Sequence, residues 1–128
     1  MSGYLTDIEK KSLANENFRE VLFTASHSQL VLMSLQPGEE IGLETHDGID
    51  QFIRVEAGTG KAILDGEEKT LADGSAVVIP AGTEHNVINT SQSEALKLYT
   101  IYSPPEHPDG TVHKTKAEAD EYEKEHHG

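Results

Sequence analysis

The stretch GSAVVIPAGTEHNVIN, residues 74–89, decides the fold of this chain. Within it, Pro80 has no N–H to donate to a strand ladder, so it ends a predicted strand over residues 76–79. Gly82 then permits a tight reversal of the backbone. His85 opens the returning strand, and the spacing therefore delivers one histidine side chain to a defined place where that strand begins.

A second pattern, GEEIGLETHDGIDQFIRVEAG at residues 38–58, supplies further side chains with donor atoms. Glu44 and His46 are two positions apart, so on a strand both point to the same face. The turn-forming residues 47–50 follow. Gln51 begins the next strand, from which its side chain is able to point back to the same spot. If Gln51 faces inward, strand alternation predicts that Glu56 faces outward.

Together the two patterns resemble the two motifs of the cupin superfamily, and residues 20–103 resemble a small single-domain cupin of the conserved-barrel type. Such chains are often labelled as resembling mannose-6-phosphate isomerase. The five fixed positions of the 74–89 motif would coincide by chance at about one start in a million, at a background use of about a fifteenth per residue type. The resemblance implies an all-β cupin barrel (a jelly roll or double-stranded β-helix) that holds one metal ion.

Short apolar stretches between glycines and prolines independently predict many short strands. The predicted strands cover residues 21–24, 30–35, 51–57, 60–64, 69–71, 76–79, 85–89 and 96–102. Asp65-Gly66 predicts a hairpin, because a two-residue type I′ turn needs positive φ at both positions. About one strand per ten residues is typical of an all-β sandwich or barrel.

The two ends of the chain differ from the predicted barrel over residues 20–103. Residues 1–19 are polar and predict an irregular N-terminal arm. Residues 104–128 begin with a loop rich in proline and glycine and end in a predicted short helix over residues 115–126, which helix propensity favours. Thr115 followed by Glu118 fits a capping box at the start of that helix.

Composition narrows the functional class. A length of 128 residues predicts one domain, and the lack of cysteine excludes disulfides and thiolate zinc sites. The net charge of −13 argues against nucleic acid and anionic membranes as partners. No apolar run approaches the roughly 20 residues of a membrane span, and the N-terminal stretch lacks the apolar region of a signal peptide. We therefore expect a cytoplasmic protein.

The resemblance to cupins also implies a ligand set. Cupins usually have two histidines separated by one residue, followed by a glutamate. Here Glu44 takes the first histidine position and Gln51 the glutamate position. His46 and His85 match histidine positions of the family motifs, so the resemblance implies that both bind the metal. Two imidazoles, a carboxylate and an amide oxygen suit one divalent ion: Zn²⁺, Mn²⁺, Fe²⁺, Ni²⁺ or Co²⁺. Many cupin-fold proteins have lost their metal, but a buried Glu44 without a cation would be costly. Gln51 is a weak ligand, so it either binds the ion or supports another ligand.

Two residues are candidates for proton transfer. Tyr102 lies on the inward face of the last predicted strand by alternation, where it serves either as a proton donor or as a packed core residue. Glu106 lies in the loop of residues 104–113 together with two histidines. That loop is either a lid that reaches the mouth of the cavity or a surface turn stabilised by prolines.

Three functions fit this set of residues. The first is an isomerase-like enzyme acting on a small oxygen-rich substrate such as a sugar or sugar phosphate, in which a base moves a proton between neighbouring carbons. The sequence offers no evident phosphate site for this enzyme, because strand alternation predicts that Arg54 faces outward. The alternatives are a metal-dependent dioxygenase and a non-catalytic module that binds a small molecule. We also expect a homodimer, because the outward Phe52 needs cover and cupins usually pair their barrels.

Overall fold

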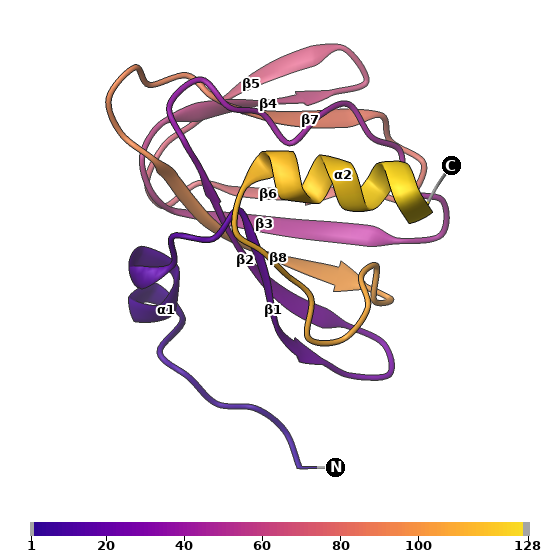
Figure 1. The fold of residues 1–128 in the computed structure, drawn as a ribbon. Helices are drawn as coiled ribbons and strands as arrows, with labels where there is room; N and C mark the ends of the chain where they lie inside the picture. The colour runs from indigo at the N-terminus through magenta and orange to yellow at the C-terminus, as the bar shows by residue number, and fades with distance from the viewer. Residues whose placement is uncertain (1, 127–128) are drawn as a thin grey trace.

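Two antiparallel sheets enclose the core in a computed structural model that describes residues 2–126 (Figure 1). The larger sheet has the strand order β6-β3-β8-β2-β1-β9 and the smaller one the order β5-β4-β7. The strands are β1 (Arg19–Thr24), β2 (Gln29–Leu35), β3 (Asp50–Ala57), β4 (Gly60–Leu64), β5 (Glu67–Leu71), β6 (Ala76–Ile79), β7 (His85–Asn89), β8 (Leu96–Ser103) and β9 (Val112–His113), and the helices are α1 (Ile8–Ala14) and α2 (Lys116–His126). The predicted all-β jelly-roll barrel with a short C-terminal helix is confirmed, and α1 adds a short helix near the N-terminus.

Turn chemistry explains why several strands begin and end where predicted. Strands β4, β6 and β7 have the predicted bounds. Asp65 and Gly66 join β4 to β5 with φ of 49° and 84°, as a type I′ turn requires. Gly82 has a φ of 84° in the reversal between β6 and β7. Local residues thus determine the ends of these strands.

The core is built by alternation along the strands of the larger sheet. Leu98 on β8 lies opposite Val55 on β3 and Met33 on β2, and all three are fully buried. At one end of the sheet the buried residues are polar: Tyr102 on β8 lies opposite Gln51 on β3 and Gln29 on β2. The candidate site lies at this end.

One side chain departs from the predicted alternation. Glu56 was expected to face solvent, but it is buried and its carboxylate lies 3.2 Å from Nε of Arg54. A register shift between Val55 and Ala57 in the pairing of β3 with β8 explains the difference. The extra residue of a β-bulge interrupts the period of two on which alternation depends.

The predicted irregular arm over residues 1–19 is wrong for residues 8–14, which form α1. Asp7 caps this helix, since its Oδ1 accepts a hydrogen bond of 3.1 Å from the backbone N–H of Lys10. At the other end, Nζ of Lys97 on β8 donates to the backbone oxygen of Asn15. Arg19 already belongs to β1, so the sheet begins inside the predicted arm.

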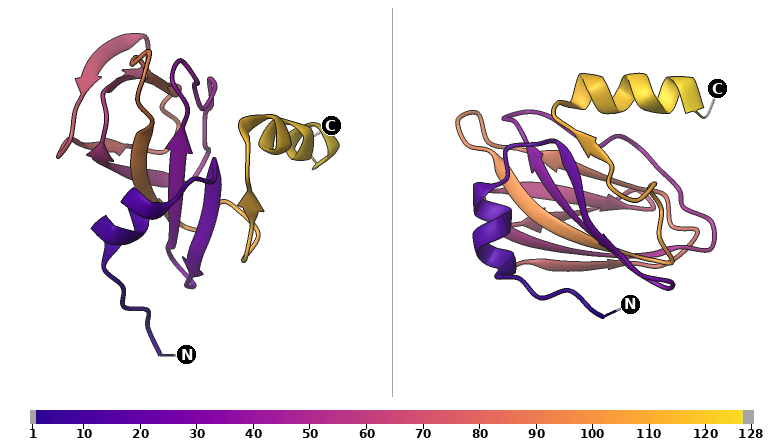
Figure 2. Two further views of the ribbon diagram at one scale, coloured as in Figure 1. Left: turned by 60° about the vertical axis from the view of Figure 1, so that its left-hand side comes forward. Right: turned by 60° about the horizontal axis from the view of Figure 1, so that its bottom comes forward.

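The C-terminal segment runs from the loop through β9, which pairs with β1, to α2 beside the barrel (Figure 2). Thr115 Oγ1 accepts the N–H of Glu118 at 3.1 Å, as the capping box predicts. The carboxylate of Glu118 accepts the N–H of Lys114 instead, at 3.2 Å. Met1, His127 and Gly128, which end the predicted 1–19 and 104–128 segments, lie outside the described residues. Neither described helix is long and apolar enough to cross a membrane.

Candidate metal centre

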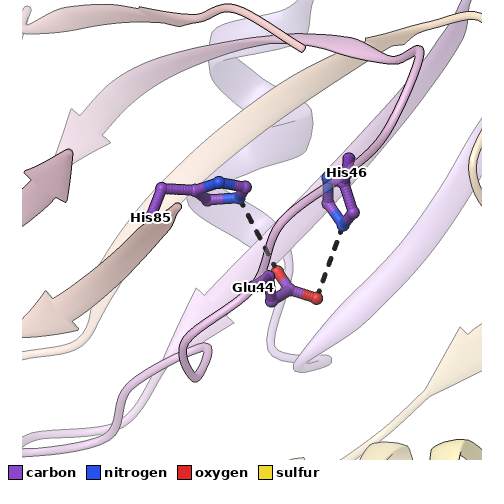
Figure 3. Close-up of side chains that lie close together, drawn as sticks. All are labelled: Glu44, His46 and His85. Carbon is purple, nitrogen blue, oxygen red and sulfur yellow. Dashed lines mark ion pairs between the residues drawn. The ribbon is translucent and has the colours of Figure 1, made fainter. Parts of the chain in front are cut away.

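Three predicted ligands converge at the polar end of the barrel (Figure 3). The Glu44 carboxylate lies between the two histidines, with Oε2 at 3.6 Å from Nε2 of His46 and Oε1 at 3.9 Å from Nε2 of His85. Two donors that each lie about 2 Å from one ion are roughly 3 to 4 Å apart, so the two carboxylate–imidazole distances fit a shared cation. Among the described side chains, those of residues 2–125, no other group of three or more histidine, aspartate or glutamate residues brings its donor atoms so close.

Backbone pairing brings the two sequence motifs together. Glu44 and His85 form an isolated β-bridge, with hydrogen bonds of 2.9 and 2.8 Å between their backbone groups. The backbone oxygen of His46 accepts the N–H of Gly82 at 3.0 Å. The sequence argument placed Glu44 and His46 on one strand, whereas the segment between β2 and β3 forms isolated bridges at Glu40 and Glu44 rather than a strand. Both side chains still point to the same place (Figure 3).

The orientation of His85 suits a metal ligand. Its Nδ1 lies 2.9 Å from the backbone oxygen of Thr83, which accepts only if Nδ1 carries the proton. In the neutral ring, Nε2 then holds the lone pair that a metal needs. This Nε2 is buried and has no hydrogen-bond partner among the described residues. Burial of an unpaired acceptor is costly, and a cation would relieve that cost.

Gln51 is arranged in a similar way. Its Nε2 donates to Oγ1 of Thr100 at 3.0 Å, which leaves Oε1 buried with no hydrogen-bond partner in the part of the chain that the structure describes. The amide oxygen is the atom of glutamine that binds metals, so this orientation matches the predicted role. Whether Gln51 binds an ion directly stays a prediction.

The electrostatics of Glu44 and His46 are coupled. Burial opposes the charge of Glu44, but the hydrogen bond and charge of His46 hold the pKa of Glu44 below its usual value. In return, the hydrogen bond to Glu44 raises the pKa of His46. A cation must displace the proton of His46 before the ring can bind it, so acid should weaken metal binding.

The structure brings both predicted catalytic residues near these ligands. The Tyr102 ring meets the His46 ring edge-on at 5.8 Å and the His107 ring at 5.2 Å. Burial raises the pKa of the Tyr102 hydroxyl far above its ordinary value, so it stays protonated. The negative charge of Glu106 helps to raise the pKa of both His46 and Tyr102. Their catalytic roles stay predictions.

Sequence reasoning missed the residue that holds the loop against the barrel. Gln29 is 1% exposed, and its Oε1 accepts the N–H groups of Glu106 and His107 at 3.2 and 3.0 Å. Its Nε2 donates to the backbone oxygen of His107 at 2.7 Å and to Thr24 at 2.9 Å. The loop therefore lies across the polar end of the barrel. No local signal marks Gln29, because its partners in the loop, Glu106 and His107, lie far along the chain.

Sequence reasoning also missed Arg19, which is buried on β1. Its positive charge contributes to lowering the pKa of Glu44. The alternation of Arg19 with Val21 would have shown it facing inward, had the strand been predicted to begin at residue 19. Arg54, in contrast, has a half-exposed side chain, in line with its predicted outward direction.

A hollow of about 500 Å³ lies elsewhere, between β9 and α2. It is lined by His113, Tyr122 and three glutamates of α2, and it contains none of the candidate metal ligands. We place the candidate site at the converging donors rather than at this hollow, because a wide surface groove offers no cluster of buried, unpaired donor atoms.

Known proteins resemble this chain closely. A sequence profile of the Cupin domain (Cupin_2) matches residues 31–102. The uncharacterized protein YrkC of Bacillus subtilis is 48% identical over 122 residues, which cover 91% of this chain and 65% of YrkC. The uncharacterized protein L612 of Acanthamoeba polyphaga mimivirus is 46% identical over 112 residues, covering 85% of this chain and 70% of L612. The crystal structure of BH2720 from Bacillus halodurans superposes with a TM-score of 0.91 at 46% identity, covering 94% of this chain and 95% of BH2720.

Proposed function

This chain belongs to the cupin family, and from that premise we propose that it binds one divalent metal ion and acts on a small, oxygen-rich substrate. One observation carries the proposal: the donor atoms of Glu44, His46 and His85 lie within 4.8 Å of one another. The unpaired oxygen of Gln51 supports it. The two imidazoles and two oxygen donors favour Zn²⁺, Mn²⁺, Fe²⁺, Ni²⁺ or Co²⁺.

We favour isomerase-like chemistry on a sugar or sugar phosphate. A bound divalent ion would polarise an oxygen of the substrate. Glu106, carried by the loop that Gln29 anchors, accepts a proton from one substrate carbon and returns it to the neighbouring carbon. Tyr102 stays neutral and donates a hydrogen bond to a substrate oxygen. The buried walls of the barrel hold the substrate away from bulk water.

A dioxygenase is the second candidate, favoured by the set of two histidines and one carboxylate. That set occurs in non-haem iron oxygenases, where it leaves positions on the ion open for substrate and O₂. Metal identity separates the two candidates. Zinc in the purified protein without oxygen uptake supports the isomerase, and iron or nickel with oxygen uptake supports the dioxygenase.

Elemental analysis of the purified protein, together with two variants, tests the proposal. We expect about one divalent ion per chain in the wild type and none in the His46→Ala, His85→Ala double variant, which should remain folded. Stoichiometric metal in that variant would exclude the site.

Glu106→Gln should retain the metal but lose turnover of sugar or sugar-phosphate substrates, whereas Asp109→Asn, in the same loop, should retain both. If the wild type binds sugars saturably without converting them, the protein is a non-catalytic binding cupin and not an enzyme.

A further inference from the structure

We propose that Arg19 forms an anion-binding subsite inside the barrel, beside the candidate metal centre, and that the substrate therefore carries a carboxylate or phosphate group. This inference rests on the proposed function and adds the chemical class of the substrate. A guanidinium recognises both groups in the same way, so the experiment must separate them.

The position of Arg19 places its charge inside the fold. It is the first residue of β1, opposite Met33 of β2 and His113 of β9, and only 4% of it is exposed. Its guanidinium carbon lies 5.3 Å from the centre of the Phe18 ring. One terminal nitrogen lies 3.3 Å from Nδ1 of His113, and Nε is buried with no hydrogen-bond partner among the residues that the structure describes.

No carboxylate among the described residues lies within ion-pair distance of Arg19. A buried charge without a partner is strongly unfavourable, so a purely structural role leaves this cost without compensation. His113 supplies no negative charge. Burial and the charge of Arg19 both lower its pKa, so the ring is neutral and acts as an acceptor for the guanidinium.

The strand register puts Arg19 on the inner face of the larger sheet, opposite the fully buried Met33. Its charge acts on Glu44, His46 and Tyr102, which surround the candidate site. Glu44 is a carboxylate whose pKa the charge of Arg19 helps to lower. Once a divalent ion engages Glu44, the end of the barrel carries excess positive charge, although the whole chain has a net charge of −13. That local excess favours an anionic ligand.

The geometry of the Arg19 guanidinium restricts which anions it is able to bind. His113 occupies one terminal nitrogen, which leaves the edge that contains Nε. That edge presents two parallel N–H donors, which match a carboxylate or phosphate bidentately. Arg19 thus supplies the anion site that Arg54, with its half-exposed side chain, does not provide.

Calorimetric titration of metal-loaded and metal-free protein with malonate, inorganic phosphate and neutral glycerol tests the subsite. We expect the wild type to bind one or both anions, and Arg19→Gln to bind them at least about tenfold more weakly, as loss of a hydrogen bond to a charged group implies. Glycerol should show no dependence on Arg19. The matched control, Arg54→Gln, should bind like the wild type. Preference for malonate identifies a carboxylate substrate, and preference for phosphate identifies a phosphorylated one.

Equal anion affinity in wild type and Arg19→Gln, or no anion binding by metal-loaded wild type, would overturn the subsite. Metal content is measured separately for every protein, so a failure of the metal site appears as absent metal and leaves the comparison of anion affinities intact. If Arg19→Gln does not fold, Arg19→Lys takes its place with Arg54→Lys as control. Lysine keeps the charge but loses the two parallel donors, so wild-type affinity in Arg19→Lys would also contradict the proposal.

Discussion

Replacing Gln29 by methionine tests whether the loop that carries Glu106 is held by one buried side chain. Methionine has a similar volume, so the change removes hydrogen bonds without opening a large cavity. Gln29 makes four hydrogen bonds, to Thr24, to the N–H of Glu106 and to both backbone groups of His107. The variant therefore probes the polar anchoring alone.

The magnitude follows from those four contacts. A typical hydrogen bond contributes about 1 kcal/mol net, and a buried group left unpaired costs about 1–3 kcal/mol. Water reaches the half-buried loop and replaces some of the lost bonds, so we expect the free energy of unfolding to fall by about 2–4 kcal/mol. For a chain of this size, that corresponds to a fall in Tm of roughly 6–15 °C.

Urea denaturation and hydrogen exchange measure the two consequences. Gln29→Met should lower the denaturation midpoint without a change in the slope of free energy against denaturant, and the amides of Glu106 and His107 should exchange faster. Gln92→Ala, at an exposed position, is the control and should change neither. Unchanged exchange at residues 106 and 107, with a loss of stability below about 0.5 kcal/mol, would show that the loop does not depend on Gln29.

Three further predictions concern pH, the fourth ligand and assembly. In metal-free protein, the pKa of Glu44 is lowered and that of His46 raised, so their pairing stabilises the fold above the ordinary Glu value of 4.5 and below the ordinary His value of 6.5. The difference in unfolding free energy between wild type and Glu44→Gln should peak in that window and shrink on both sides; a flat difference from pH 4 to 8 would contradict the pairing. Gln51→Leu should weaken metal affinity by about 10–100-fold while the two histidines retain the ion, as competition with a chelator would show; unchanged affinity would remove Gln51 from the site. We also predict a homodimer through the outer face of the larger sheet, where Phe52 lies opposite Val78, which is 66% exposed. Light scattering at micromolar concentration should give twice the chain mass for the wild type and the mass of one chain for Val78→Asp. A wild-type monomer would refute this prediction.

Much of the fold could be predicted because its signals are local. Pro80, Gly82 and the Asp65-Gly66 turn act through their own backbone preferences, so strand ends and the reversal before His85 were readable. Helix α1 was equally readable from Asp7 at its N-cap, but the polar composition of residues 1–19 obscured it. The bulge at Glu56 was not readable, because it depends on how β3 pairs with β8.

The sequence by itself determined the barrel, the end of it at which donors gather, and the identity of Glu44, His46 and His85 as the residues that meet there. Only the tertiary structure decided that Gln29 binds the loop of Glu106 and that Arg19 is buried beside His113. The physical reason is the range of the interactions. Turns and alternation follow from neighbouring residues, whereas the environment of a buried charge or amide depends on groups that the folded chain brings from far along the sequence.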